Sequence, residues 1–143
     1  MPTNEQQLQD IVHLAQSGRD FFASVGPGAA ETEVRAAFAY VADVKSRLVH
    51  ALATWASPLA VGRSASVNAG EKLYTEARQT FRSDAPAPAA TVLTQAEDQL
   101  LRLVECAFET TRVPALRQLL KSFYSEVAIC RQAMARLQSR LAA

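Results

Sequence analysis

Few side chains in this sequence are of the types that perform chemistry, and there are only two cysteines and two histidines. Cys106 and Cys130 lack the CxxC spacing of a redox or metal motif, and the residues beside Cys106 supply no cation that would activate its thiol. We therefore predict that both cysteines are small core residues. The sequence also lacks a Gly-rich phosphate loop and a CxxCH haem motif, and Met134 fits a core position better than a haem ligand.

The two histidines are the remaining candidates for a metal site. His13 lies in the first half of the chain's first helical segment, and His50 lies near the end of the second. If those segments are antiparallel neighbours, the two imidazoles and one carboxylate could form a ligand set. We interpret both histidines instead as boundary or surface residues.

Among the segments that could position candidate site residues, the C-terminal part of the chain has the most regular pattern of apolar residues. From Leu116 to Leu141 the apolar residues follow one another at alternating steps of four and three residues. That spacing is an unbroken heptad seam, which places the side chains on one stripe of a single α-helix that must pack against other helices. The stripe consists of Leu116, Leu120, Phe123, Val127, Cys130, Met134, Leu137 and Leu141.

Helical patterns fill most of the remaining chain as well. A Gly-Pro-Gly sequence at 26–28 ends the first helix, and Pro114 suits the first turn of the last one. A crossover at 57–90 contains a short helix from Asn68 to Arg82. The main helices are expected at about 3–25, 30–55, 91–109 and 114–141.

Three pairs of residues have the spacing of a capping box, in which a polar residue before a helix and a second one three positions later cap its first turn. These pairs predict where helices begin. They are Thr3 with Gln6, Asn68 with Glu71, and Thr94 with Glu97.

Composition and charge exclude several classes of protein. The 143 residues, 49% hydrophobic and 20% charged, predict one domain over residues 1–143. A net charge of +1, with basic and acidic residues mixed, disfavours binding to nucleic acid. We expect a cytoplasmic protein without a membrane span, because no apolar run is long enough and the N-terminus does not resemble a signal peptide. The basic residues of the last helix match the negative end of its dipole; they are Lys121, Arg131, Arg136 and Arg140.

The short links make the first two helices one antiparallel hairpin and the last two another, so the predicted fold is an all-α four-helix bundle with a long crossover. This whole pattern resembles the ferritin-like superfamily, and in particular small bacterial ferritin-like four-helix domains of uncharacterised function. The resemblance covers about residues 5–140. It is carried by 8–22 with its Ser-Gly-Arg-Asp turn, by 33–52, by the crossover at 66–81, and by the opening of the third main helix at 94–97.

Active members of this superfamily hold two iron or manganese ions with buried glutamates and Glu-x-x-His pairs. Carried onto this sequence, the resemblance implies Asp20, Glu97 and Glu126 as the carboxylates of such a site. The pattern is incomplete, because the sequence contains no Glu-x-x-His; Leu100 and Ile129 stand three residues after Glu97 and Glu126. We therefore expect no metal, no cofactor and no catalytic residues.

One carboxylate near the end of the first helix has a further interpretation. A buried Asp20 would need a neutralising partner, and Lys45 is the candidate inward-facing cation on the second helix. We therefore predict a structural salt bridge between Asp20 and Lys45 where a ferritin-like relative holds a metal.

Taken together, the sequence favours a non-catalytic module that binds an unknown protein partner or forms a homodimer. The alternative is a divergent di-iron or di-manganese carboxylate protein, either an oxidase or an iron store. A third interpretation is a small-ligand pocket between the hairpins, lined by Phe21, Phe22, Phe38 and Tyr40.

Overall fold

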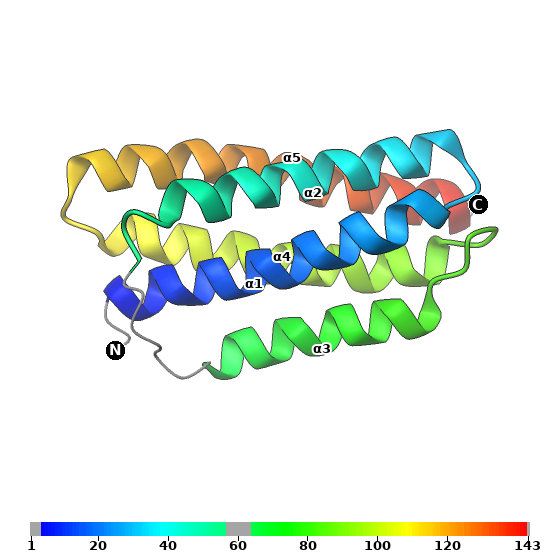
Figure 1. The fold of residues 1–143 in the computed structure, drawn as a ribbon, viewed down its shortest axis with the longest axis horizontal. Helices are drawn as coiled ribbons and strands as arrows, with labels where there is room; N and C mark the ends of the chain where they lie inside the picture. Colours follow the sequence, from blue (N-terminus) through cyan, green and yellow to red (C-terminus); the bar gives the residue numbers. More distant parts are fainter. Residues whose placement is uncertain (1–3, 57–63, 143) are drawn as a thin grey trace.

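The computed structural model describes residues 4–56 and 64–142, and within these ranges all regular secondary structure is helical. The all-α class predicted from the sequence is therefore confirmed. The described residues form five α-helices and one short 3-10 turn (Figure 1). They are α1 (Asn4–Val25), η1 (Gly26–Gly28), α2 (Thr32–Leu52), α3 (Ala65–Thr80), α4 (Ala87–Thr110) and α5 (Pro114–Ala142).

The heptad seam of the C-terminal helix is confirmed. Helix α5 begins at Pro114, and every residue of the predicted stripe from Leu116 to Leu137 is buried. The side chain of Leu141 lies outside the described residues. Because the stripe repeats at the heptad period, α5 keeps one continuous face against the other helices.

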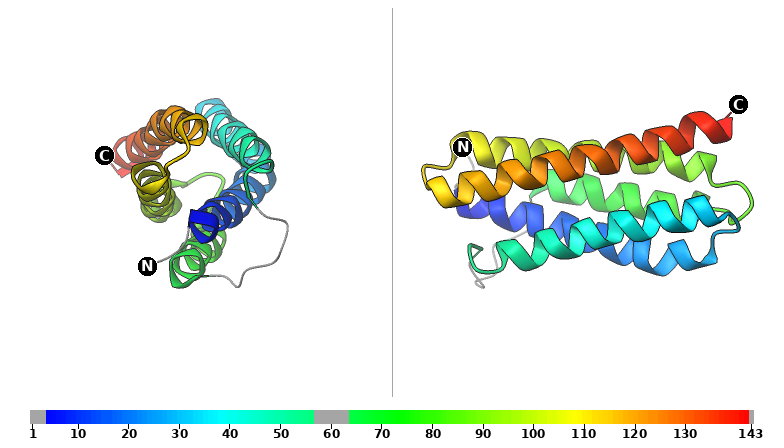
Figure 2. Two further views of the ribbon diagram at one scale, coloured as in Figure 1. Left: turned by 90° about the vertical axis from the view of Figure 1, so that its left-hand side faces the viewer. Right: turned by 90° about the horizontal axis from the view of Figure 1, so that it is seen from above.

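The helices pack as two antiparallel hairpins, α1 with α2 and α4 with α5 (Figure 1). Helix α1 also packs on α4, and α2 packs on α5, so each hairpin contacts the other along both of its helices. In the end-on view, α2 and α4 occupy opposite corners of this four-helix arrangement (Figure 2). They make no direct helix-to-helix contact within the described residues.

Helix α3 is a packed part of the core. It lies along α1 and α4, and it buries Val67, Gly70, Tyr74 and Ala77. The predicted start at Asn68 with a cap from Glu71 is wrong. The helix begins one turn earlier because the hydroxyl of Ser64 accepts a hydrogen bond from the backbone N–H of Val67 at 3.2 Å.

The start of α4 also differs from the prediction. The helix begins at Ala87, with Pro88 in its first turn, where the fixed φ of proline suits a helix. Thr94 is therefore an internal residue, and its hydroxyl donates a hydrogen bond to the carbonyl of Ala90 at 2.9 Å. The predicted capping box of Thr94 and Glu97 is therefore wrong. Because the prediction placed Glu97 at a helix start, it did not place this residue in the core.

Helix α2 is shorter than predicted at both ends, since it runs from Thr32 to Leu52. The backbone N–H groups of Ala53 and Trp55 donate to the carbonyls of His50 and Leu52 in tight turns that end the helix. Trp55 consequently leaves the buried stripe and is 38% exposed. The predicted cap at Thr3 lies outside the described residues. None of the described helices is both long enough and apolar enough to cross a membrane.

Candidate functional site

An ion pair between Lys45 and Glu97 lies at the centre of the bundle. The Nζ of Lys45 donates a hydrogen bond to Oε2 of Glu97 at 2.9 Å and lies 2.8 Å from Oε1. The two side chains are 1% and 0% exposed. Because α2 and α4 stand at opposite corners, the lysine side chain spans the core to reach its partner.

Both charged residues occupy positions that the heptad spacing assigns to the core. On α2 one row of buried residues alternates at steps of four and three, and Lys45 stands at one of these steps. The same holds for Glu97 in one row of buried residues on α4. This spacing is the signal in the sequence that could have placed both charged residues in the core. The buried residues of the two seams are Val34, Phe38, Val41, Lys45, Leu48 and Leu52 on α2, and Leu93, Glu97, Leu100, Val104 and Ala107 on α4.

Gly18 on α1 provides the space through which the lysine side chain passes. A Cβ atom at Gly18 would lie 2.7 Å from both Cδ and Cε of Lys45 and 2.6 Å from the hydroxyl oxygen of Tyr74. The side chains from α2 and α3 therefore meet at the same point on the surface of α1. A glycine inside a helix costs about 1 kcal/mol relative to alanine, and here this close approach explains its presence.

The hydroxyl of Tyr74 is buried and has no hydrogen-bond partner among the described residues. Burial raises the pKa of this hydroxyl well above its ordinary value, and the nearby charge of Glu97 raises the pKa further. The phenol of Tyr74 therefore stays protonated and neutral at physiological pH.

Cys130 on α5 lies near the same ion pair. The prediction that both cysteines are small core residues is confirmed for Cys130, which is buried, and is wrong for Cys106, whose side chain is exposed. Burial raises the pKa of its thiol to about 12, and the charge of Glu97 adds to the increase while that of Lys45 opposes it. The nucleophilic form of cysteine is the thiolate, so this thiol is chemically inert in the folded protein at neutral pH. Each of the five helices thus contributes one residue, and we call this set the central polar cluster: Gly18, Lys45, Tyr74, Glu97 and Cys130.

Aromatic side chains close one side of the central polar cluster. The Nζ of Lys45 lies 5.9 Å from the centroid of the Phe22 ring, within the range of a cation–π interaction. Phe22 in turn packs edge-on against Phe21 and Phe38, with centroids 5.1 and 5.0 Å apart. This wall keeps water from the ammonium group, so the charges of Lys45 and Glu97 interact without solvent screening.

The energetics of such a pair are asymmetric. Taking two charges out of water costs several kcal/mol each, and their attraction offsets that cost only while both partners are present. Removing one partner is strongly destabilising, whereas replacing both with apolar residues is often neutral. Arrangements of the helices that separate Lys45 from Glu97 are therefore disfavoured, because they would leave a buried charge unpaired.

The structure does not bring together the three carboxylates of the metal-site alternative. Asp20 is exposed on α1 and lies 3.4 Å from Nε of Arg19. Glu97 is held by its lysine partner in the core, and Glu126 on α5 lies 2.8 Å from a guanidinium nitrogen of Arg47. Among the described residues, no three His, Cys, Asp or Glu side chains are grouped so as to hold a metal ion. These donors do not fit a pair of divalent cations, which need several converging carboxylate oxygens.

The predicted salt bridge between Asp20 and Lys45 is wrong, although the inward position of the lysine is right. Asp20 is 67% exposed and needs no buried partner. The partner of Lys45 is Glu97 instead. Because α4 begins earlier than predicted, Glu97 lies in the buried seam of this helix and not in its first turn.

The predicted small-ligand pocket does not form either. Phe21, Phe22 and Phe38 pack on one another in the core, so their rings fill the space between the helices. Tyr40 lies on the outside of α2 and is 38% exposed. Of the two histidines, His13 is half-buried on α1 and His50 is exposed near the end of α2.

Comparisons of this chain with protein-family models, curated proteins and solved structures find no match. The central polar cluster and the outer surface of the bundle are therefore the features from which a function can be inferred.

Proposed function

We propose that this protein is a non-catalytic, ferritin-like helical bundle that acts by binding a protein partner or a second copy of itself. The observation that carries the proposal is the ion pair between Lys45 and Glu97. The ferritin-like resemblance assigns Glu97 to a metal site, yet both of its oxygens lie within 2.9 Å of an ammonium group. A cation fixed at that distance repels a divalent metal ion and leaves the carboxylate without spare charge to bind it.

The direction of the helices supports the ferritin-like part of the proposal. Helices α1 and α5 run one way along the bundle, whereas α2 and α4 run the other way (Figure 1). A long connection between the second and third helices of a bundle gives this order, and α3 supplies that connection. In the described part of the crossover, α3 packs against both α1 and α4.

The outer surface supports the association part of the proposal. Ile129 on α5 is 50% exposed, and the exposed Tyr40 lies on the neighbouring helix α2. Exposed apolar side chains of this size are where a helical bundle can contact another protein. The charges in the core are paired with each other, and side chains fill the space between the helices. We therefore expect the protein to act through its outer surface.

Metal content decides between this proposal and the di-metal alternative. The wild-type protein and the Glu97→Gln variant would be loaded with ferrous iron under anaerobic conditions, desalted and analysed by plasma mass spectrometry, and the same would be done with manganese. We expect no stoichiometric metal in either protein. About two metal ions per chain in the wild type, lost in Glu97→Gln while circular dichroism shows the variant folded, would refute the proposal and favour an oxidase or an iron store.

A further inference from the structure

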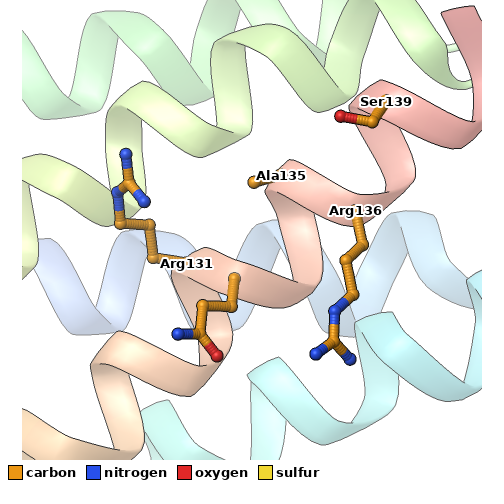
Figure 3. Close-up of a pocket in the computed structure, with 5 residues that line it drawn as sticks. Arg131, Ala135, Arg136 and Ser139 are labelled. Carbon is orange, nitrogen blue, oxygen red and sulfur yellow. The ribbon is translucent and has the colours of Figure 1, made fainter.

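Helix α5 carries a second regular stripe on the side that faces away from the core. Its residues follow one another at steps of three, four, three and four, and their side chains are exposed or half-buried. A shallow groove of about 710 Å³ lies along the C-terminal part of this stripe, beside Ala135 and Ser139 and between Arg131 and Arg136 (Figure 3). We call this stripe the outer face of α5, and it consists of Ser125, Ala128, Gln132, Ala135 and Ser139.

The order of residues on the outer face is nearly the same in both directions from Gln132. Serine lies seven residues away on each side, and alanine lies four residues before and three residues after. Two copies of α5 that pair antiparallel about Gln132 would therefore place small side chains opposite small side chains. Small residues let two helix backbones approach closely, and the stripe covers about 21 Å at 1.5 Å per residue.

An exposed apolar residue borders this stripe. Ile129 is half exposed on α5 itself. In the same antiparallel arrangement, the side chain of Ile129 meets the groove beside Ala135 of the second copy. Burial of this side chain would supply the apolar contact that the small residues alone lack.

The charges beside the outer face are self-complementary on the side toward α2, and on the side toward α4 Arg131 is paired with Asp98. In the sequence Glu126 comes before Gln132 and Arg136 follows it. Arg136 points toward α2 (Figure 3), and Glu126 lies on the same side, where it pairs with Arg47 of α2. Arg136 forms no ion pair with another described residue, whereas Glu126 lies with Asp43 at the guanidinium of Arg47. A two-fold axis at Gln132 places Arg136 of one copy within about 3 Å, along the helix axis, of Glu126 of the other.

We propose that the outer face of α5 is a homodimer interface in which two copies pair antiparallel through α5, with the two-fold axis at Gln132. This inference rests on the proposed function and names the second copy of this chain as the partner. Charge complementarity between Arg136 and Glu126 sets the antiparallel direction, and Ile129 provides the apolar contact. Both contacts occur twice, as a two-fold interface requires.

The first test measures the oligomeric state by sedimentation velocity across a range of protein concentrations. We expect the wild type to shift from monomer to dimer as the concentration rises. Ile129→Asp should weaken this dimer about tenfold or more, and Arg136→Glu should weaken it as well. The control is Gln79→Glu on the exposed side of α3, which should leave the dimer unchanged. A wild type that stays monomeric, or a dimer that Ile129→Asp does not weaken, would overturn the inference.

A cross-linking experiment tests the position of the two-fold axis. In a Cys106→Ser background, which removes the exposed native thiol, Gln132→Cys and Gln79→Cys would be oxidised separately. Gln132→Cys should form a disulfide-linked dimer on a non-reducing gel, because the axis brings both copies of residue 132 together. Equal cross-linking of the two variants would overturn the inference. Neither failure would affect the assignment of a non-catalytic core, which the metal analysis tests by itself.

Discussion

Replacement of Lys45 with methionine tests the central polar cluster directly. Methionine is also long, unbranched and flexible, so it can retain the packing of the lysine stem against Gly18 while removing the charge. The change leaves the carboxylate of Glu97 in the core without its neutralising cation. Because the two side chains are 1% and 0% exposed, solvent screening cannot reduce the effect, and we expect the free energy of unfolding to fall by about 3–5 kcal/mol.

Urea denaturation followed by circular dichroism measures this loss, and Arg47→Met is the matched control on the same helix. Arg47 also pairs with two carboxylates, those of Asp43 and Glu126, but its side chain is 46% exposed. Its removal should therefore cost only about 0–1 kcal/mol. If Lys45→Met costs no more than Arg47→Met, the interpretation of a desolvated ion pair is refuted.

The double variant Lys45→Met/Glu97→Leu completes the experiment. It removes both charges and fills the core with apolar side chains, so it should recover most of the stability that Lys45→Met loses. This variant also keeps the test decisive if the single variant does not fold. A double variant no more stable than the single one would show that the loss came from packing rather than from an unpaired charge.

Other expected outcomes follow from the same geometry. Gly18→Ala should lower the free energy of unfolding by about 1–3 kcal/mol, because the added methyl group meets side chains of α2 and α3. In the control Gly28→Ala, a Cβ atom would have no neighbour within 4 Å, so the free energy of unfolding should change little. Equal urea midpoints for the two variants would contradict the prediction. A thiol-reactive reagent should modify Cys106 in the native protein and reach Cys130 only after denaturant is added, and prompt reaction of both thiols would contradict the burial of Cys130. The unfolded chain loses the Cys130 proton near the ordinary pKa of 9.0 and the folded chain keeps it to about 12, so stability should fall as the pH rises through this range. The contribution is about 1.4 kcal/mol per pH unit, and denaturation of Cys130→Val over the same pH series should lack it.

The packing of the helices could be predicted from the sequence to a large extent, because apolar periodicity depends on the core alone. The stripe from Leu116 to Leu137 is buried as its spacing indicates. Helix boundaries were less predictable, because several polar residues satisfied the same capping pattern. Asn68 and Glu71 have the spacing of a capping box, but the hydroxyl of Ser64 caps α3. Thr94 and Glu97 have the same spacing, but α4 begins at Ala87 with Pro88 in its first turn, so Thr94 lies inside the helix.

The central polar cluster could be predicted only in part, for a related reason. The inward position of Lys45 could be recognised because it interrupts an apolar stripe. Its partner could not, because a glutamate near an assumed helix start has a local explanation in capping. The pairing of Lys45 on α2 with Glu97 on α4 is a long-range side-chain contact across the core, and one sequence contains no direct signal for it.

The ion pair has a consequence for the order in which the chain folds. Each hairpin can form from contacts between neighbouring helices, but Lys45 and Glu97 are 52 residues apart and belong to different hairpins. Their charges lose water only when the two hairpins dock, so the pair forms late on the folding pathway. Variants of either residue should therefore act mainly on the rate of unfolding and leave the rate of folding almost unchanged. The cluster that fixes the packing of the native bundle would then determine how long the folded state lasts.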